Sequence, residues 1–184
     1  VLHDVLDNWG SRKKGTLTGV PTGYFDLDDI LSGLQKSDLI ICAGRPSMGK
    51  TALALSIARN AALEYGHRVG VFSLEMSNTQ LVERLITAEA RVDSHLVRTG
   101  RLPKNEWKRL SQAAGPLSEA NIFIDDSAGL HVMELRAKAR QLKAEHDVDL
   151  IIVDYIQLLN AGGKVESRQQ EISFISRSLK ALAK

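Results

Sequence analysis

The sequence predicts an α/β fold in which helices cover both faces of a mainly parallel sheet. Two observations lead to this fold class. Four short apolar runs bounded by Gly, Asp or Asn have the composition of strands, and segments with helical periodicity separate them. Strands that alternate with helices pair in parallel, because each crossover helix returns the chain to the same edge of the sheet. A chain of 184 residues is long enough for one such domain.

Residues 1–15 are expected to form a short helix followed by a flexible linker. The apolar residues Leu2, Val5, Leu6 and Trp9 have the spacing of one helical face, and a segment rich in Gly, Ser and basic residues follows them. This apolar stripe has two interpretations, since it can pack on its own domain or dock on a neighbouring subunit.

The domain itself is expected to span residues 16–184. The runs at 38–43 and 149–154 are apolar throughout, which is typical of strands buried on both faces, so Cys42 is expected to be buried. The remaining elements are expected as strands at 68–75 and 121–125, and as helices at 26–33, 50–65, 77–92, within 94–119, at 132–146, and in a last segment with Ile172, Ile175, Leu179 and Leu182 on one face.

The two ends of the sequence indicate a piece of a longer protein. The first residue is Val1 rather than Met, and the chain stops after an amphipathic helix with no strand behind it. We therefore expect the sheet to be incomplete at its C-terminus.

Composition narrows the classes of protein to which this chain can belong. With 24 basic and 22 acidic residues the net charge is +2, and 43% of residues are hydrophobic, which argues against a disordered chain or a polycationic tail. A single cysteine excludes an internal disulfide and a cysteine-based zinc site. We expect a cytoplasmic protein, because a single cysteine suits the reducing cytosol. We expect no membrane partner, because no apolar run approaches the ~18 residues of a membrane span.

A glycine-rich phosphate-binding motif lies between the first expected strand and the helix after it. The octapeptide GRPSMGKT fits the pattern G-x-x-x-x-G-K-[ST], in which glycines let backbone N–H groups approach phosphate oxygens. The helix that follows directs its positive N-terminal end at the same anion. Lys50 is expected to reach the β- and γ-phosphates of ATP, and the Thr51 hydroxyl to bind Mg²⁺. The nucleotide-binding segment is expected to comprise Gly44, Arg45, Pro46, Ser47, Met48, Gly49, Lys50, Thr51 and Ala52.

Two acidic residues are expected at the same edge of the sheet as this motif. Asp154 ends an apolar strand, where a carboxylate can hold the Mg²⁺ shell. Glu75 ends the strand at 68–75, and it can orient or deprotonate the attacking water. The alternative for Glu75 is a helix-capping role. Because Tyr155 rather than a second acid follows Asp154, the catalytic interpretation of Glu75 is favoured.

These motifs, with the phrases VFSLEMS, IIVDYIQL and SRQQEISFISRSLKALA, resemble the DnaB-type replicative DNA helicases from about Thr18 to the end of the chain. The resemblance implies a RecA-like ATPase domain that a linker helix joins to an N-terminal domain. It also implies a homo-hexamer that moves on single-stranded DNA with ATP and Mg²⁺, with primase and a helicase loader as partners.

The resemblance extends to single residues. It implies that residues 1–9 are the linker helix that packs on the adjacent subunit. It places the γ-phosphate-sensing glutamine, the basic finger and the main DNA loops beyond Lys184, so the chain alone is expected to be a weak or inactive motor. Arg84 matches a basic residue of the nucleotide site, with a solvated helix face as the alternative. The other matches are Glu75 as the catalytic glutamate, Lys50 and Thr51 as the phosphate and Mg²⁺ residues, and Asp154 as the metal-shell aspartate.

Other residues give weaker signals. Lys164 and Arg168, in the loop at 161–168, are candidates for a surface that faces DNA phosphates, and an ordinary exposed loop is the alternative. Trp107 is expected to be a packing residue rather than a platform for bases.

Three functions are compatible with these observations. The first is ATP hydrolysis that drives translocation on DNA, in the ATPase part of a replicative helicase. The second is another RecA-like ATPase, either a strand-exchange recombinase or a clock-type ring ATPase. In the third, the chain is a nucleotide-binding and assembly module without turnover.

Overall fold

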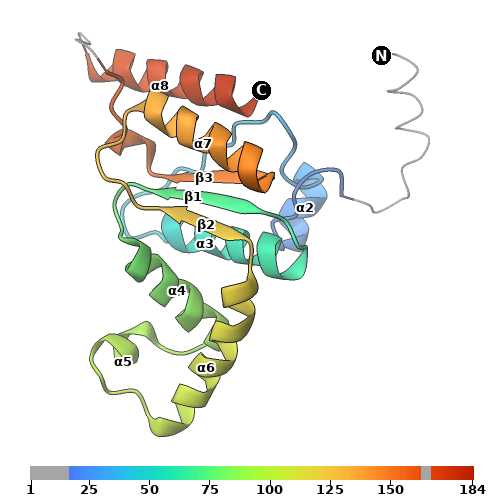
Figure 1. Ribbon diagram of the computed structural model, residues 1–184, viewed down its shortest axis with the longest axis vertical. Coiled ribbons are helices and arrows are strands. Elements are labelled where there is room, and N and C mark those ends of the chain that lie inside the picture. The colour runs from blue at the N-terminus through green and yellow to red at the C-terminus, as the bar shows by residue number, and fades with distance from the viewer. Residues whose placement is uncertain (1–16, 163–166) are drawn as a thin grey trace.

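Three parallel strands form the centre of the protein, whose computed structural model describes residues 17–162 and 167–184. They are β1 (Val69–Ser73), β2 (Ile122–Asp125) and β3 (Leu150–Asp154), and they pair in the order β2-β1-β3. Both pairings are parallel. Figure 1 shows helices on both sides of this sheet, so the predicted fold class is confirmed.

The helices lie close to their predicted positions. Figure 1 shows α7 and α8 on one face of the sheet, α3 and α4 toward the other, and α5 with part of α6 extending away below. Their bounds are α2 (Phe25–Leu31), α3 (Lys50–Arg59) with its π-helical continuation η1 (Asn60–Glu64), α4 (Asn78–Ala90), α5 (Ser94–Arg98), α6 (Lys104–Glu119), α7 (Val132–His146), the 3-10 helix η2 (Ile156–Leu158) and α8 (Arg168–Ala183).

The central strand β1 divides the core into two halves. Val69 and Val71 pack in one cluster with residues of α3 and α4, and Phe72 packs in another with residues of α7 and α8. This division follows from the pleat, because successive side chains of a strand point to opposite faces. On the α7 side, a Cβ atom at Gly70 would lie 3.3 Å from Leu142 Cδ1, so a larger residue there would require Leu142 to move by a few tenths of an ångström.

The start of α4 is held by side chains that the sequence predicted in part. Ser77 Oγ accepts a hydrogen bond from the Gln80 backbone N–H at 3.4 Å, and Gln80 Oε1 accepts one from the Ser77 N–H at 3.2 Å. This is the capping box that the Ser-x-x-Gln spacing indicates. Asp126, after β2, also accepts a hydrogen bond from the Asn78 N–H at 2.8 Å. The first turn of α4 is thereby attached to the carboxyl end of the sheet.

The strand expected at 38–43 is not formed, so that prediction is wrong. Leu39 packs against the α7–α8 half of the core, but Ile40 and Ile41 are 51% and 58% exposed. Cys42 is exposed as well, which corrects the expectation that it is buried. An apolar run becomes a strand only when a neighbour pairs with its backbone. Among the described residues, β3 pairs with β1 alone and has no strand on its other edge.

Other expectations have mixed outcomes. Trp107, expected to be a packing residue, is 56% exposed, so most of its side chain lies outside the core. The helix expected at 1–9 and the residue Lys164 lie outside the described residues. Within the described ranges, no helix combines the length and apolar character needed to cross a membrane. The same ranges contain no group of three His, Cys, Asp or Glu side chains arranged for a metal ion.

Candidate nucleotide-binding site

The glycine-rich segment forms an exposed loop that leads directly into α3. Within it, the Met48 N–H donates to the Arg45 carbonyl at 3.3 Å. Ser47 and Gly49 have φ angles of 63° and 86°, in the left-handed region, and Gly49 is the N-cap of α3. Space around Gly49 is open, so its backbone angle, and not crowding, favours glycine there. Since the first N–H groups of a helix lack intrahelical partners, this arrangement leaves donors at the loop for an anion.

Lys50 folds back over the start of the loop. A Cβ atom at Gly44 would lie 3.3 Å from Lys50 Cγ, so glycine makes room for the lysine stem. The Lys50 ammonium lies 5.3 Å from the centroid of the Tyr155 ring, at the distance of a cation–π interaction. Tyr155 directly follows β3, so the ammonium is held at the carboxyl end of the sheet. The position of Tyr155 beside Asp154 was the only sequence signal for this contact.

Thr51 and Asp154, both predicted as metal ligands, meet in the structure. Thr51 Oγ1 donates a hydrogen bond of 2.6 Å to Asp154 Oδ2. A hydroxyl and a carboxylate oxygen at one point form a donor set that suits a hard cation such as Mg²⁺. The residues present therefore fit the metal that the motif implies.

Glu75 lies just beyond β1, at the edge of the sheet where Asp154 ends β3. Ser73 pairs in register with Asp154, and the Leu74 N–H donates to the Asp154 carbonyl at 2.8 Å. Ser73 is 1% exposed, and its hydroxyl donates to the Met76 carbonyl at 2.7 Å and accepts from the Met76 N–H at 3.2 Å. This turn holds the backbone that carries Glu75. Ser73 was not among the residues predicted from the sequence, although a hydroxyl in an otherwise apolar strand was a signal.

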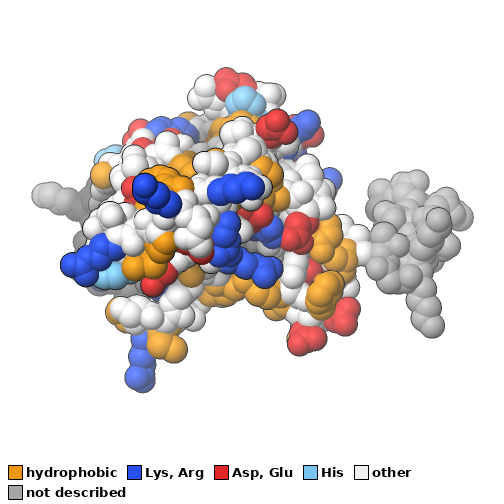
Figure 2. All heavy atoms as spheres, turned by 90° about the horizontal axis from the view of Figure 1, so that it is seen from below, with side chains coloured by type: hydrophobic (Ala, Val, Ile, Leu, Met, Phe, Trp, Pro, Cys, Tyr) orange, Lys and Arg blue, Asp and Glu red, His pale blue; other side chains and the backbone are white. Residues whose placement is uncertain are grey.

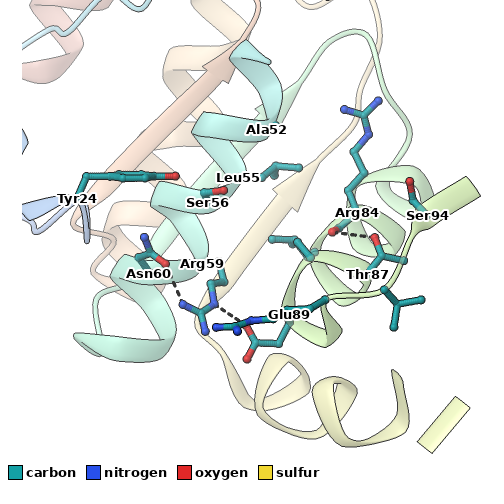
Figure 3. A pocket seen from close by; sticks show the side chains of 14 residues that line it. Tyr24, Ala52, Leu55, Ser56, Arg59, Asn60, Arg84, Thr87, Glu89 and Ser94 are labelled. Carbon is teal, nitrogen blue, oxygen red and sulfur yellow. Dashed lines mark hydrogen bonds and ion pairs between the residues drawn. The ribbon is translucent and has the colours of Figure 1, made fainter. Parts of the chain in front are cut away.

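Arg84 lines a cavity of about 680 Å³ between α3 and α4, and Ala52 lines the same cavity. Arg59, Asn60 and Glu89 line it too: Arg59 Nε donates to Glu89 at 2.5 Å, and an Arg59 NH group donates to Asn60 at 2.9 Å. Figure 3 shows the Arg84 side chain extending away from this network, toward the end where Ala52 lies. Arg84 is thus exposed beside the helix that carries the phosphate loop.

Arg168 is engaged within the chain. Its guanidinium donates to the Glu171 carboxylate and to the Gln157 carbonyl, which ties the start of α8 to η2. The Arg168 hydrogen bond, helped by one from the Ala161 N–H, lowers the pKa of Glu171. The Arg168 side chain nevertheless stays 53% exposed.

Residues 19–184 match the family model described as the DnaB-like helicase C terminal domain. This chain belongs to that family. The DnaB-like chain spans about two fifths of two curated relatives. The replicative DNA helicase DnaB of Geobacillus stearothermophilus is 50% identical over 174 residues, which is 94% of this chain and 38% of the relative. The replicative DNA helicase DnaC of Bacillus subtilis (strain 168) is 47% identical over 187 residues, or 100% of this chain and 41% of the relative.

Solved structures show the same likeness. A DnaB-like replicative helicase, described with its interactions with primase, superposes with a TM-score of 0.93 at 35% identity, covering 100% of this DnaB-like chain and 45% of that one. A second solved structure, described as an ATPase domain, has the same TM-score and identity, with coverage of 99% and 65%. The expected RecA-like fold is thereby confirmed.

Proposed function

We propose that this chain is the ATPase part of a ring-shaped replicative DNA helicase, in which ATP hydrolysis drives movement along single-stranded DNA and unwinding of the duplex. The observation that carries the proposal is the meeting of Thr51 with Asp154 at 2.6 Å, beside the glycine-rich loop. Lys50 and Glu75 lie at the same carboxyl edge of the sheet, where α/β folds bind ligands.

Each residue of the edge has a role in the proposed hydrolysis. The segment from Gly44 to Ala52 binds the phosphates through backbone N–H groups and the start of α3. Lys50 neutralises charge on the γ-phosphate, and Thr51 with Asp154 holds Mg²⁺, which when bound supplies further charge neutralisation at the phosphate oxygens. Glu75 orients the attacking water and accepts its proton. Arg84 contributes positive charge from the neighbouring cavity.

The proposal includes an assembly. Six subunits form the ring, and residues 1–9 of each are the linker helix that docks on a neighbour. A basic residue from the next subunit completes each site, and such a finger accelerates phosphoryl transfer by ~10³–10⁵-fold. Lys164 and Arg168 face the DNA phosphates. The proposed partners are single-stranded DNA, primase and a helicase loader, and the proposed location is the cytoplasm.

The experiment that tests this proposal measures ATP turnover and unwinding of a forked DNA duplex by the intact protein that contains this chain. Glu75→Gln should lower both rates by about 10²–10⁴-fold while ATP binding persists. The matched control is Glu83→Gln on the exposed side of α4, which should change neither rate. Lys50→Ala should abolish turnover.

Other results would redirect the assignment. Near-normal turnover in Glu75→Gln or Lys50→Ala contradicts the proposed site. Hydrolysis that DNA stimulates without unwinding favours a recombinase or clock-type ATPase. Tight ATP binding with negligible turnover in the intact wild-type protein favours an assembly module.

A further inference from the structure

Basic charge is concentrated at the end of the molecule formed by α5 and the start of α6. Residues 91–109 contain six Lys or Arg and two Asp or Glu, which gives +4, whereas the whole chain carries +2. The rest of the chain is therefore net negative, at −2. Figure 2 views the molecule from this end, and Lys and Arg side chains gather across it with apolar side chains between them.

The acidic residues of this segment are already engaged. Asp93 accepts a hydrogen bond from the His95 N–H at 2.8 Å and caps α5. Glu106 pairs with Arg109 at 2.8 Å. Five basic residues of the segment form no ion pair with any other described residue, and all five are exposed: Arg91, Arg98, Arg101, Lys104 and Lys108. Their charge faces solvent without a counter-charge from the described part of the chain.

An exposed indole lies among these cations. On α6, Leu110 and Ala113 are buried, while Trp107 is 56% exposed. Lys104 precedes Trp107 by three residues and therefore neighbours it on the helix surface, and Lys108 is one turn from Lys104. Leaving most of a tryptophan side chain in water loses hydrophobic free energy. An exposed tryptophan surrounded by cations therefore indicates a binding surface.

We propose that this surface, defined by Arg98, Arg101, Lys104, Trp107 and Lys108, binds a single strand of nucleic acid, with Trp107 stacked on a base and the basic side chains on phosphates. Cationic grooves with aromatic platforms bind single strands without sequence preference. An acidic protein would match the charge but would not need the indole. The inference rests on the proposed function, since unwinding produces single strands outside the nucleotide site.

The fluorescence of Trp107 can report whether a base stacks on it. Because the chain has two tryptophans, Trp9→Phe leaves Trp107 as its sole indole fluorophore. Adding oligothymidylate to this 184-residue variant should quench the Trp107 fluorescence and saturate. Inorganic polyphosphate should compete for binding yet leave the fluorescence nearly unchanged, because it carries charge without bases. Equal quenching by both polymers would overturn stacking and indicate an acidic partner instead.

Charge and stacking are separated by further variants, with binding followed by the anisotropy of labelled oligothymidylate. Lys104→Gln with Lys108→Gln should reduce the slope of log affinity against log salt by about 1.4, since each phosphate contact on a single strand contributes about 0.7. Lys36→Gln with Lys184→Gln is the matched control, because both lysines are exposed and form no ion pair within the described chain. Trp107→Ala should weaken binding about tenfold.

Failure of this inference is distinguishable from failure of the proposed function. If Arg168→Gln weakens DNA binding while the α6 variants do not, the surface is not used and the proposed function stands. If the intact protein unwinds DNA at the normal rate but Trp107 shows no quenching, the same conclusion holds. If the intact wild-type protein does not unwind DNA but oligothymidylate still quenches Trp107, the result supports binding at this surface and contradicts the proposed helicase function.

Discussion

Thr51 Oγ1 donates a 2.6 Å hydrogen bond to Asp154 Oδ2, although 103 positions separate the two residues in the chain. The contact joins the first turn of α3 to the last residue of β3. A hydrogen bond to an ionised acceptor is stronger than a neutral one, so it fixes both oxygens before any ligand binds. The position where the motif predicts a metal is therefore arranged in advance.

Removal of the Thr51 hydroxyl should weaken ATP binding only when Mg²⁺ is present. Thr51→Val keeps the shape of the side chain and removes the oxygen, so we expect ATP affinity with Mg²⁺ to fall about tenfold, or ~1.4 kcal/mol. Titration with ATP in Mg²⁺ and in a chelator checks this, and Thr51→Ser should behave as wild type. An equal loss in both conditions would mean that Thr51 acts through the loop fold rather than through the metal.

The contact between Lys50 and Tyr155 predicts a modest and specific effect. Because the ring lies 5.3 Å from the ammonium, Tyr155→Leu removes an interaction worth ~0.5–1 kcal/mol, and ATP should bind about threefold more weakly. Tyr155→Phe keeps the ring face and should bind normally. A double-mutant cycle supplies the control, since Tyr155→Leu should have no effect in a Lys50→Ala background. The same loss in both backgrounds would show that Tyr155 acts without Lys50.

The edge of the sheet was predictable from local pattern. The motif GRPSMGKT follows an apolar run, and Glu75 and Asp154 each end one. Parallel strands bring their carboxyl ends together at one edge of the sheet. The contacts that hold this edge were not predictable in the same way. The Ser73 hydroxyl forms hydrogen bonds with the Met76 backbone, and the Tyr155 ring contacts the Lys50 ammonium. Such contacts depend on the geometry of the folded chain and not on local sequence pattern.

The segment at 38–43 shows a limit of pattern reasoning. Its residues have strand composition, and the apolar run predicted burial on both faces. Burial depends on which other segments pack against the run. Among the described residues of this run, only Leu39 packs against the core. Trp107 is the converse case, because a residue type typical of cores lies exposed among cations. In both cases neighbours distant in sequence decide the outcome.

The turn before α2 should depend on one buried carboxylate. Asp28 is 4% exposed and accepts hydrogen bonds from the N–H and hydroxyl of Thr22, at 2.9 and 2.8 Å, and from the Gly23 N–H at 3.0 Å. Asp28→Ala leaves these donors without their acceptor, so the free energy of unfolding should fall by about 3 kcal/mol. Urea unfolding measures this change.

The neighbouring acid on the same helix is the control for Asp28. Asp29 is exposed, so Asp29→Ala should change the free energy of unfolding by less than about 0.5 kcal/mol. If the two variants unfold at the same urea concentration, the three hydrogen bonds to Asp28 do not stabilise the fold as argued.

Asp125 at the end of β2 should make stability depend on pH. Burial alone would raise its pKa, but hydrogen bonds from Lys138 at 2.7 Å and from Ser127 outweigh burial and hold the pKa below its ordinary value of 3.8. The folded state therefore favours the carboxylate. Its stabilisation is fully present above the ordinary pKa and is lost as the pH falls through the lower folded value.

The difference in unfolding free energy between wild type and Asp125→Asn should thus be about 1 kcal/mol from about pH 5 to 8, and should shrink below its ordinary pKa of 3.8. Urea unfolding across this pH range measures it. Asp29→Asn, an exposed acid without these partners, should show a difference near zero throughout. A difference for Asp125→Asn that grows as the pH falls would mean that the protonated carboxyl is the form favoured by the fold, since only a raised pKa gives that sign.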